Sequence, residues 1–96
     1  MRKYELMMIL NPALTEADRD ALIATVESEL GDTGVSIVSR DHPGEQKLAY
    51  RIRGSETGYY LLYILESEGN GGFFDVSNSF NIKKDIWRYM FMKLED

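Results

Sequence analysis

The sequence predicts an α+β sandwich in which one antiparallel sheet carries two helices on a single face. Three observations predict it: 96 residues suit one compact domain, four apolar stretches have the length of strands, and two other stretches repeat apolar residues at helical spacing. These stretches follow the order β-α-β-β-α-β, which is the order of a ferredoxin-like sandwich. We therefore expect residues 1–96 to form a single ferredoxin-like domain.

The chain begins with a predicted strand and a long helix. Residues 2–10 are predicted to form a strand with an apolar run over residues 6–10, and the turn signal Asn11-Pro12 ends it. Thr15 is suited to cap the following helix, because its side-chain oxygen can accept a hydrogen bond from a free backbone N–H. Apolar residues then recur four positions apart at Leu22, Val26 and Leu30. Gly31 is expected to end the helix, since glycine tolerates a left-handed backbone.

Two more strands are predicted in the middle of the chain. Residues 35–40 alternate apolar and polar side chains, as a half-buried strand does. Residues 41–44 interrupt this strand, and strand character resumes over residues 47–53. Residues 54–58 carry turn-forming residues and predict a loop. Residues 59–66 are dense in aromatic and branched aliphatic side chains, which is typical of a strand.

The last third of the chain predicts a short helix and a final strand. The glycine-rich segment 69–72 breaks the preceding strand, and residues 86–94 form the last strand. Between them, helical spacing is shown by Phe73, Val76 and Phe80. A dinucleotide-binding loop would need a third glycine at position 74, which is Phe74. We therefore expect a plain connection there and no bound cofactor.

The face of the sheet without helices should be mostly polar, because two helices can cover only one side. Three strands instead carry apolar residues in both of their alternating phases. A contiguous apolar surface of this kind usually marks an interaction site. Predicted partner contacts on this open face are Met7, Ile9, Met90 and Met92. Self-association, or scattered exposed apolar residues without a partner, is the alternative interpretation.

Composition excludes several kinds of site. The chain has no cysteine, which excludes a disulfide scaffold, a cysteine-rich zinc site and a thiol nucleophile. His42 is the only histidine and lies in a predicted turn, so neither a catalytic triad nor a metal site is expected. No segment has the length of a membrane span, and the start lacks the apolar region of a signal peptide. We expect a cytoplasmic protein that is not an enzyme.

The net charge of −5 opposes nucleic-acid binding, but the charges are unevenly distributed. Acids concentrate in residues 15–32, whereas residues 46–54 and 83–93 are mostly basic. Basic and aromatic residues occur together on three predicted strands; these are Arg2, Lys3, Tyr4, Lys47, Tyr50, Arg51, Arg53, Arg88, Tyr89 and Lys93. Arginine and lysine bind phosphates, and tyrosine can stack on an unpaired base. Core tyrosines and edge lysines that oppose aggregation are the alternative explanation.

Several segments resemble one protein family in order and spacing. They are Met1-Arg2-Lys3-Tyr4-Glu5 with the strand-ending Asn11-Pro12, Lys47-Leu48-Ala49-Tyr50 with Ile52, Gly58-Tyr59-Tyr60, and Ile86-Trp87-Arg88-Tyr89-Met90 with Lys93. Together they cover nearly the whole chain and are similar to the bacterial family of small-ribosomal-subunit protein six. The resemblance independently implies the βαββαβ fold.

The resemblance also implies a function and a set of contacts. It implies binding to the central domain of small-subunit ribosomal RNA, as a heterodimer with the basic small-subunit protein eighteen. Residues that match the RNA-contacting positions of the family are Arg2, Lys3, Tyr4, Lys47, Tyr50 and Arg88. The chain departs from the family at Arg51, where proline is usual, at residues 45–46, where basic residues are common, and at Asp96, where many members continue.

Two other classes of protein remain as alternatives. A ferredoxin-like regulatory module would bind a small ligand or self-associate through the open sheet face, and would have no affinity for RNA. An acylphosphatase-like enzyme shares only the fold class. That enzyme needs a glycine-rich phosphate loop with a paired arginine and asparagine, which the sequence does not contain.

Overall fold

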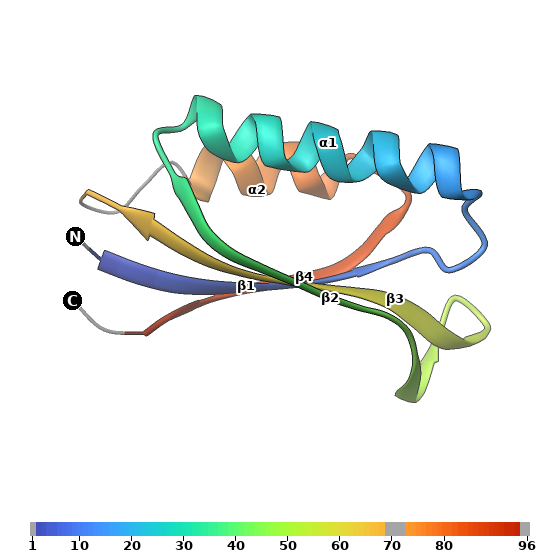
Figure 1. The fold of residues 1–96 in the computed structure, drawn as a ribbon. Helices are drawn as coiled ribbons and strands as arrows, with labels where there is room; N and C mark the ends of the chain where they lie inside the picture. Colours follow the sequence, from blue (N-terminus) through green and yellow to red (C-terminus); the bar gives the residue numbers. More distant parts are fainter. Residues whose placement is uncertain (1, 69–72, 95–96) are drawn as a thin grey trace.

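The computed structural model describes residues 2–68 and 73–94, and it confirms the predicted order of four strands and two helices. The elements are β1 (Arg2–Leu10), α1 (Glu16–Asp32), β2 (Ser36–Ile52), β3 (Ser55–Ser67), α2 (Phe73–Asn81) and β4 (Ile86–Lys93). Both helices lie on the same side of the sheet (Figure 1). The other face of the sheet is therefore left without a covering layer.

The four strands form one antiparallel sheet in the order β2-β3-β1-β4. β1 lies in the interior of the sheet and pairs with β3 from Arg2 opposite Ser67 to Leu10 opposite Tyr59. Its other edge pairs with β4. The strands β2 and β4 form the two edges. Since β1 and β4 run antiparallel, the ends of the described chain lie close together at one end of the sheet (Figure 1).

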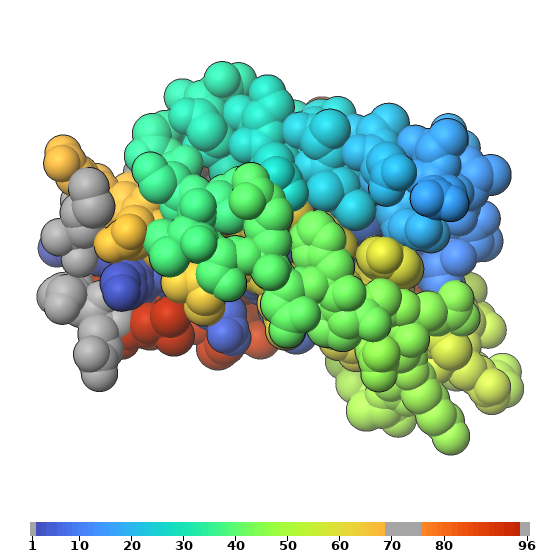
Figure 2. Space-filling model, viewed as in Figure 1, coloured from blue at the N-terminus to red at the C-terminus, as the bar shows by residue number. Residues whose placement is uncertain are grey.

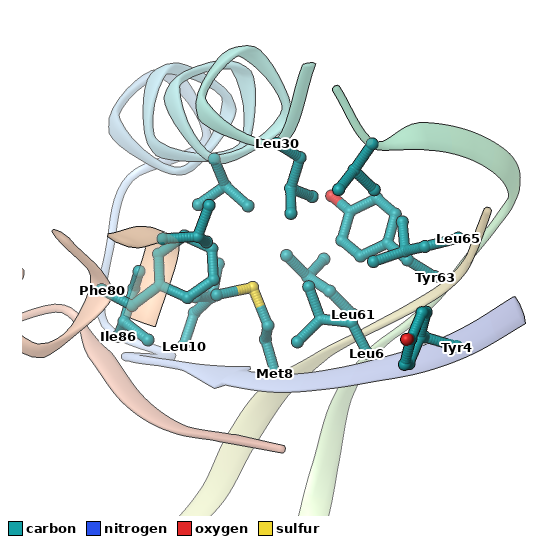
Figure 3. Close-up of a cluster of buried hydrophobic side chains, with 13 residues drawn as sticks. Tyr4, Leu6, Met8, Leu10, Leu30, Leu61, Tyr63, Leu65, Phe80 and Ile86 are labelled. Atoms are coloured by element: carbon teal, nitrogen blue, oxygen red, sulfur yellow. The ribbon is translucent and has the colours of Figure 1, made fainter. Parts of the chain in front are cut away.

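The main core lies between the sheet and the helices (Figure 3). Alternate residues of β1 and β3 point into it, and the apolar stripes of both helices close it from above. The fully buried side chains are Leu6, Met8, Leu10, Val26, Leu30, Leu61, Tyr63 and Leu65. Val76 and Phe80 of α2 are also buried, which confirms the helical spacing predicted for this segment. Each such side chain stabilises the fold by about 1.5–3 kcal/mol relative to exposure.

The start of α1 agrees with the prediction and its end does not. The Thr15 hydroxyl accepts a hydrogen bond from the Asp18 N–H at 3.1 Å, which confirms the cap. The helix continues past Gly31 to Asp32, so the predicted stop at Gly31 is wrong. The left-handed residue is Gly34, with φ +83°. Gly31 and Gly34 both fit the sequence signal for a helix end, and only the chain reversal into β2 distinguishes them.

The β2–β3 hairpin is longer and tighter than the sequence predicts. β2 is one strand, and the predicted interruption at residues 41–44 is a register shift between Asp41 and Gly44 within it. The predicted loop at residues 54–58 is wrong, because β3 already begins at Ser55. The reversal is a two-residue turn in which Arg53 and Gly54 have φ values of 50° and 80°. Two successive positive φ values are typical of the primed hairpin turns.

The last strand contains an irregularity that changes one side chain's face. Ile9 pairs with Arg88 and Leu10 pairs with Ile86, so Trp87 is an extra residue in a β-bulge. Ile86 consequently joins the main core, whereas Trp87 packs beside Ile9 on the open face. The strand ends at Lys93, one residue before its predicted end. The predicted glycine-rich break at 69–72 lies outside the described residues.

The far end of the β2–β3 hairpin bends away from the helices (Figure 1). In the space-filling view this hairpin end projects below the plane of the sheet at the right (Figure 2). The projection places residues near the turn beside the open face and not along the edge of a flat sheet. This bend creates the surface described next.

Candidate binding interface

The centre of the open face is apolar and accessible. Met7 lies between Leu62 of β3 and Met90 of β4 in the strand register. Met90 is 46% exposed and Met92 is 41% exposed, which is unusual for large apolar side chains on a sheet. These three methionines are among the four residues predicted to contact a partner, and all three share one face.

The hairpin end covers the fourth predicted partner residue. Leu48 and Ile52 pack on Ile9, and the three form a small buried cluster separate from the main core. Gly58 makes this packing possible, because a side-chain Cβ there would collide with Ile9 and press on Leu48 at 3.2 Å. Ile9 is only 6% exposed as a result. Its surface is used mostly within the chain, and little remains for a partner.

A groove of about 340 Å³ lies between the bent hairpin and the centre of the open face. Its volume falls within the range of about 300–1,000 Å³ that is common for ligand pockets. The hairpin supplies Leu48, Ala49, Tyr50 and Ile52, and the sheet supplies Met7, Ile9, Tyr60, Arg88, Tyr89 and Met90. The groove therefore joins predicted partner residues to two predicted RNA residues, Tyr50 and Arg88.

The basic side chains around this groove come from two distant parts of the sequence. Lys47 lies on the hairpin opposite Thr57, and Arg88 lies on β4 opposite Ile9. Tyr50 is 72% exposed, so its ring is free to contact another molecule. Three of the six predicted RNA residues, Lys47, Tyr50 and Arg88, thus lie at one end of the sheet.

The other three predicted RNA residues lie at the opposite end of the sheet. Arg2 and Lys3 begin β1, and about 20 Å of strand separates Lys3 from Ile9 at about 3.3 Å per residue. Lys3 is exposed and pairs with Glu66 of β3. Tyr4 lies on the helix-covered side, belongs to the main core and is 8% exposed. The six residues form two separate groups, and Tyr4 has little surface for RNA.

A coupled set of polar side chains, Glu27, Tyr63 and Arg40, lies on the helix side of the sheet and not in the groove. The Glu27 carboxylate of α1 accepts a hydrogen bond from the Tyr63 hydroxyl at 3.1 Å and one from Arg40 at 3.0 Å. Burial of Tyr63, with the nearby charge of Glu27, raises the pKa of this tyrosine above its ordinary value of 10.0. The hydrogen bond to Glu27 also raises the pKa of Arg40. These groups connect α1 to the sheet.

The described residues contain no cluster of side chains that could hold a metal ion. Within residues 2–68 and 73–94, no three histidine or acidic side chains come together as a metal site would require. His42 lies edge-on to the Tyr63 ring at 5.5 Å and is otherwise exposed. No helix in the described part of the chain is long and apolar enough to cross a membrane.

Sequence reasoning identified half of the residues that line the groove, namely Met7, Ile9, Tyr50, Arg88 and Met90. Leu48 and Ile52 line it because the hairpin bends, and Trp87 packs beside them because β4 has a bulge. One available signal was Gly58, since a glycine within a strand often marks a close approach of two segments. The bulge at Trp87 depends on pairing between distant strands, and no local pattern marks it.

Comparison with known sequences gives matches over most of the chain. The model of the family described as "Ribosomal protein S6" matches residues 3–93. A Fusobacterium nucleatum protein named "Small ribosomal subunit protein bS6" is 37% identical over 93 residues, which is 97% of this chain and 98% of that protein. A Koribacter versatilis protein of the same name is 41% identical over 68 residues, covering 71% of this chain and 46% of that protein.

Comparison with solved structures gives the same fold. The crystal structure of 30S ribosomal protein S6 from Thermotoga maritima matches with a TM-score of 0.89 at 23% identity. The match covers 97% of this chain and 87% of that chain. At this level of identity the likeness concerns the fold, and it supports the ferredoxin-like arrangement predicted from the sequence.

Proposed function

The chain belongs to the ribosomal protein S6 family, and from this premise we propose that it binds the central domain of small-subunit ribosomal RNA together with small-subunit protein eighteen. Members of this family are structural, non-enzymatic components of the small ribosomal subunit. The RNA region and the partner protein are those that the sequence resemblance implies. We also propose that the protein is cytoplasmic and associated with the ribosome.

The exposed apolar face is the single observation that carries this proposal. A monomeric domain rarely leaves a group of large apolar side chains such as Met90 and Met92 exposed on one face of a sheet. Methionine is flexible and polarisable, and it adapts well to a partner's surface. We assign Met7, Met90 and Met92 to the contact with protein eighteen, and Ile9 to the support of that contact from beneath.

Charge distribution supports the RNA contact despite the acidic composition. The net charge of −5 belongs to the whole chain, whereas the bent hairpin carries Lys47 and β4 carries Arg88 at the same end of the sheet as the groove. A local basic surface can hold phosphates when the total charge is negative. A basic partner such as protein eighteen would lower the repulsion between the acidic regions and RNA.

The proposed residue roles follow from position on the sheet. Lys47 and Arg88 neutralise phosphates beside the groove, and Tyr50 packs at the boundary of RNA and partner. Arg2 and Lys3 form a second, separate contact at the other end of β1. Tyr4 is only 8% exposed, so its proposed role is to anchor the start of β1 in the core and not to contact RNA.

The experiment is a titration of a central-domain RNA fragment with this protein, with and without protein eighteen, at several salt concentrations. We expect tight binding only when both proteins are present. Lys47→Gln and Arg88→Gln should each lower the magnitude of the log–log salt slope by about 0.7–0.9, because each removes one phosphate contact. Arg40→Gln is the matched control, since Arg40 pairs with Glu27 on the helix side.

The regulatory-module alternative makes a different prediction for the same samples. It requires a stable homodimer of the free protein, or binding of a small ligand in the groove, with no affinity for RNA. Sedimentation of the free protein distinguishes the two functions. A stable homodimer that binds no RNA, even with protein eighteen present, would contradict the ribosomal proposal.

A further inference from the structure

A second hollow, of about 420 Å³, adjoins the groove where the β2–β3 turn approaches the start of β4. We call it the arginine notch. Its polar walls are Arg53 of the turn, Asn81 at the end of α2 and Arg88 of β4. Phe80 and Trp87 contribute apolar surface. Residues far apart in the sequence thus place two guanidinium groups around one shared space.

The arginine notch has a local charge that the protein does not balance. Within the described part of the chain no acidic residue lines it, although the chain as a whole is acidic. Among the described residues, Arg53 has no hydrogen bond or ion pair. Arg88 donates one hydrogen bond from Nη1 to the Trp87 carbonyl at 2.7 Å. Most guanidinium N–H groups in the notch are therefore available to an anion.

The backbone at Arg53 is a second and independent observation. Arg53 has φ +50° and is the only described non-glycine residue with positive φ. Turns with two successive positive φ values favour Asn-Gly or Gly-Gly, and arginine is an uncommon first residue. Sparsely populated backbone conformations tend to persist at functional sites. An arginine in this position places a cation at the hairpin tip, where asparagine would serve the turn better.

We propose that the arginine notch binds a backbone phosphate of the ribosomal RNA, with Arg53 and Arg88 contacting the same phosphate group. Guanidinium groups bind phosphate oxygens through paired N–H donors, and two of them can neutralise one phosphodiester. The inference rests on the proposed function and adds a specific contact for Arg53, which the family resemblance does not assign. It also explains why a strained residue at this turn is cationic.

The test uses Arg53→Asn in the complex with protein eighteen and the RNA fragment. This variant should fold at least as stably as the wild type, because Asn-Gly is the favoured sequence for the turn. Raising salt from 50 to 200 mM should weaken wild-type binding about three-fold more than variant binding, the effect of one phosphate contact. Arg51→Gln is the control, since Arg51 is on the same hairpin, pairs with Glu56 at 3.0 Å and does not line the notch.

A double variant tests whether one phosphate is shared. If Arg53 and Arg88 contact the same group, Arg53→Asn combined with Arg88→Gln should weaken binding by less than the product of the two single effects. A multiplicative loss, or a salt slope of Arg53→Asn equal to that of wild type, overturns the inference while the proposed function stands. Weaker binding of Arg53→Asn to protein eighteen in the absence of RNA also overturns it, because the notch would then bind an acidic side chain of that protein. Wild-type protein that binds no RNA with protein eighteen overturns both.

Discussion

The two faces of the sheet are built from alternate residues of the same strands, yet they lie in opposite environments. On the helix-covered face, Leu6, Met8 and Leu61 are completely buried. On the open face, Met90 and Met92 keep 46% and 41% of their surface exposed. Both faces are apolar, but the chain has helices for only one of them. Strand composition therefore reveals two apolar faces, and the topology decides which of them is left for another molecule to cover.

The open face is itself graded along the strands. At the hairpin end, Leu48 and Ile52 cover Ile9, and at the other end the face becomes polar with Lys3 and Glu5. Exposed methionines occupy the region between these ends. A partner would therefore meet a central apolar strip bordered by charge, which is the usual arrangement of a protein interface.

Truncating one side chain on each face should give the largest difference in stability between the two faces. Leu61→Ala should lower the free energy of unfolding by about 2–5 kcal/mol, because it leaves a cavity among fully buried side chains. Met90→Ala should cost less than about 1 kcal/mol in the free protein, since nearly half of Met90 already contacts water. Urea unfolding measures both. Equal losses would show that the open face is buried in the free protein.

Gly58→Ala should disrupt the packing of the hairpin against the open face. A Cβ at this position would collide with Ile9, and overpacking of this kind costs about 1–3 kcal/mol. Combining it with Ile9→Ala should give a smaller loss than the sum of the single losses, because the second change removes the colliding atoms. The double-mutant cycle is read from urea midpoints. Additive losses would mean that the two segments do not pack together.

Because Tyr63 donates a hydrogen bond to Glu27, we expect the free energy of unfolding to fall at alkaline pH. The folded pKa of Tyr63 is raised above 10.0, so the folded state keeps a proton that the unfolded state loses. This stabilising contribution is complete below pH 10.0 and is lost as the pH rises toward the raised folded pKa. Tyr63→Phe should cost about 1–2 kcal/mol at neutral pH and flatten this part of the stability profile. An unchanged alkaline slope in the variant would contradict the assignment.

The smallest expected difference in stability is between two salt bridges, one on the helix side and one at the hairpin. Lys83 binds Glu29 at 2.9 Å where both side chains are mostly covered, and it also donates to the Ser79 hydroxyl at 2.7 Å. Lys83→Met should therefore cost about 0.5–1 kcal/mol on the helix side. The Arg51–Glu56 pair at the hairpin is exposed on both sides, so Arg51→Gln should change stability by less than about 0.5 kcal/mol. Thermal unfolding in low and high salt measures both; a larger effect at Arg51 would reverse the predicted order.

The overall fold was predictable from the sequence because its signals are local. Apolar alternation marked β1 and β3, spacing of four marked α1 through Val26 and Leu30, and Thr15 marked its start. The end of α1 was not predictable with the same accuracy, since Gly31 and Gly34 carry the same local information. Likewise, the turn at Arg53–Gly54 lacks the usual Asn-Gly sequence, and a longer loop was expected in its place.

The candidate site was predictable only in part, because it depends on contacts between distant segments. Alternation in β1 and β4 correctly placed Met7, Met90 and Met92 on one face. The bend of the hairpin and the bulge at Trp87 follow from strand pairing and packing, which no single segment encodes. The burial of Tyr4 does follow the local alternation, since Tyr4 is in phase with the buried Leu6 and Met8. Whether the six predicted RNA residues contact RNA stays a prediction, and the structure divides them between two ends of the sheet.

The central claim is that the apolar open face binds small-subunit protein eighteen, and its most direct test is calorimetric titration with that protein. Met90→Asp places a charge in the proposed interface and should weaken binding about ten-fold or more, because an unpaired charge would be buried on association. Ile82→Asp is the matched control, since Ile82 is 83% exposed and lies outside the groove. Wild-type affinity for Ile82→Asp with a clear loss for Met90→Asp is the predicted result. Equal binding by both variants would contradict the account.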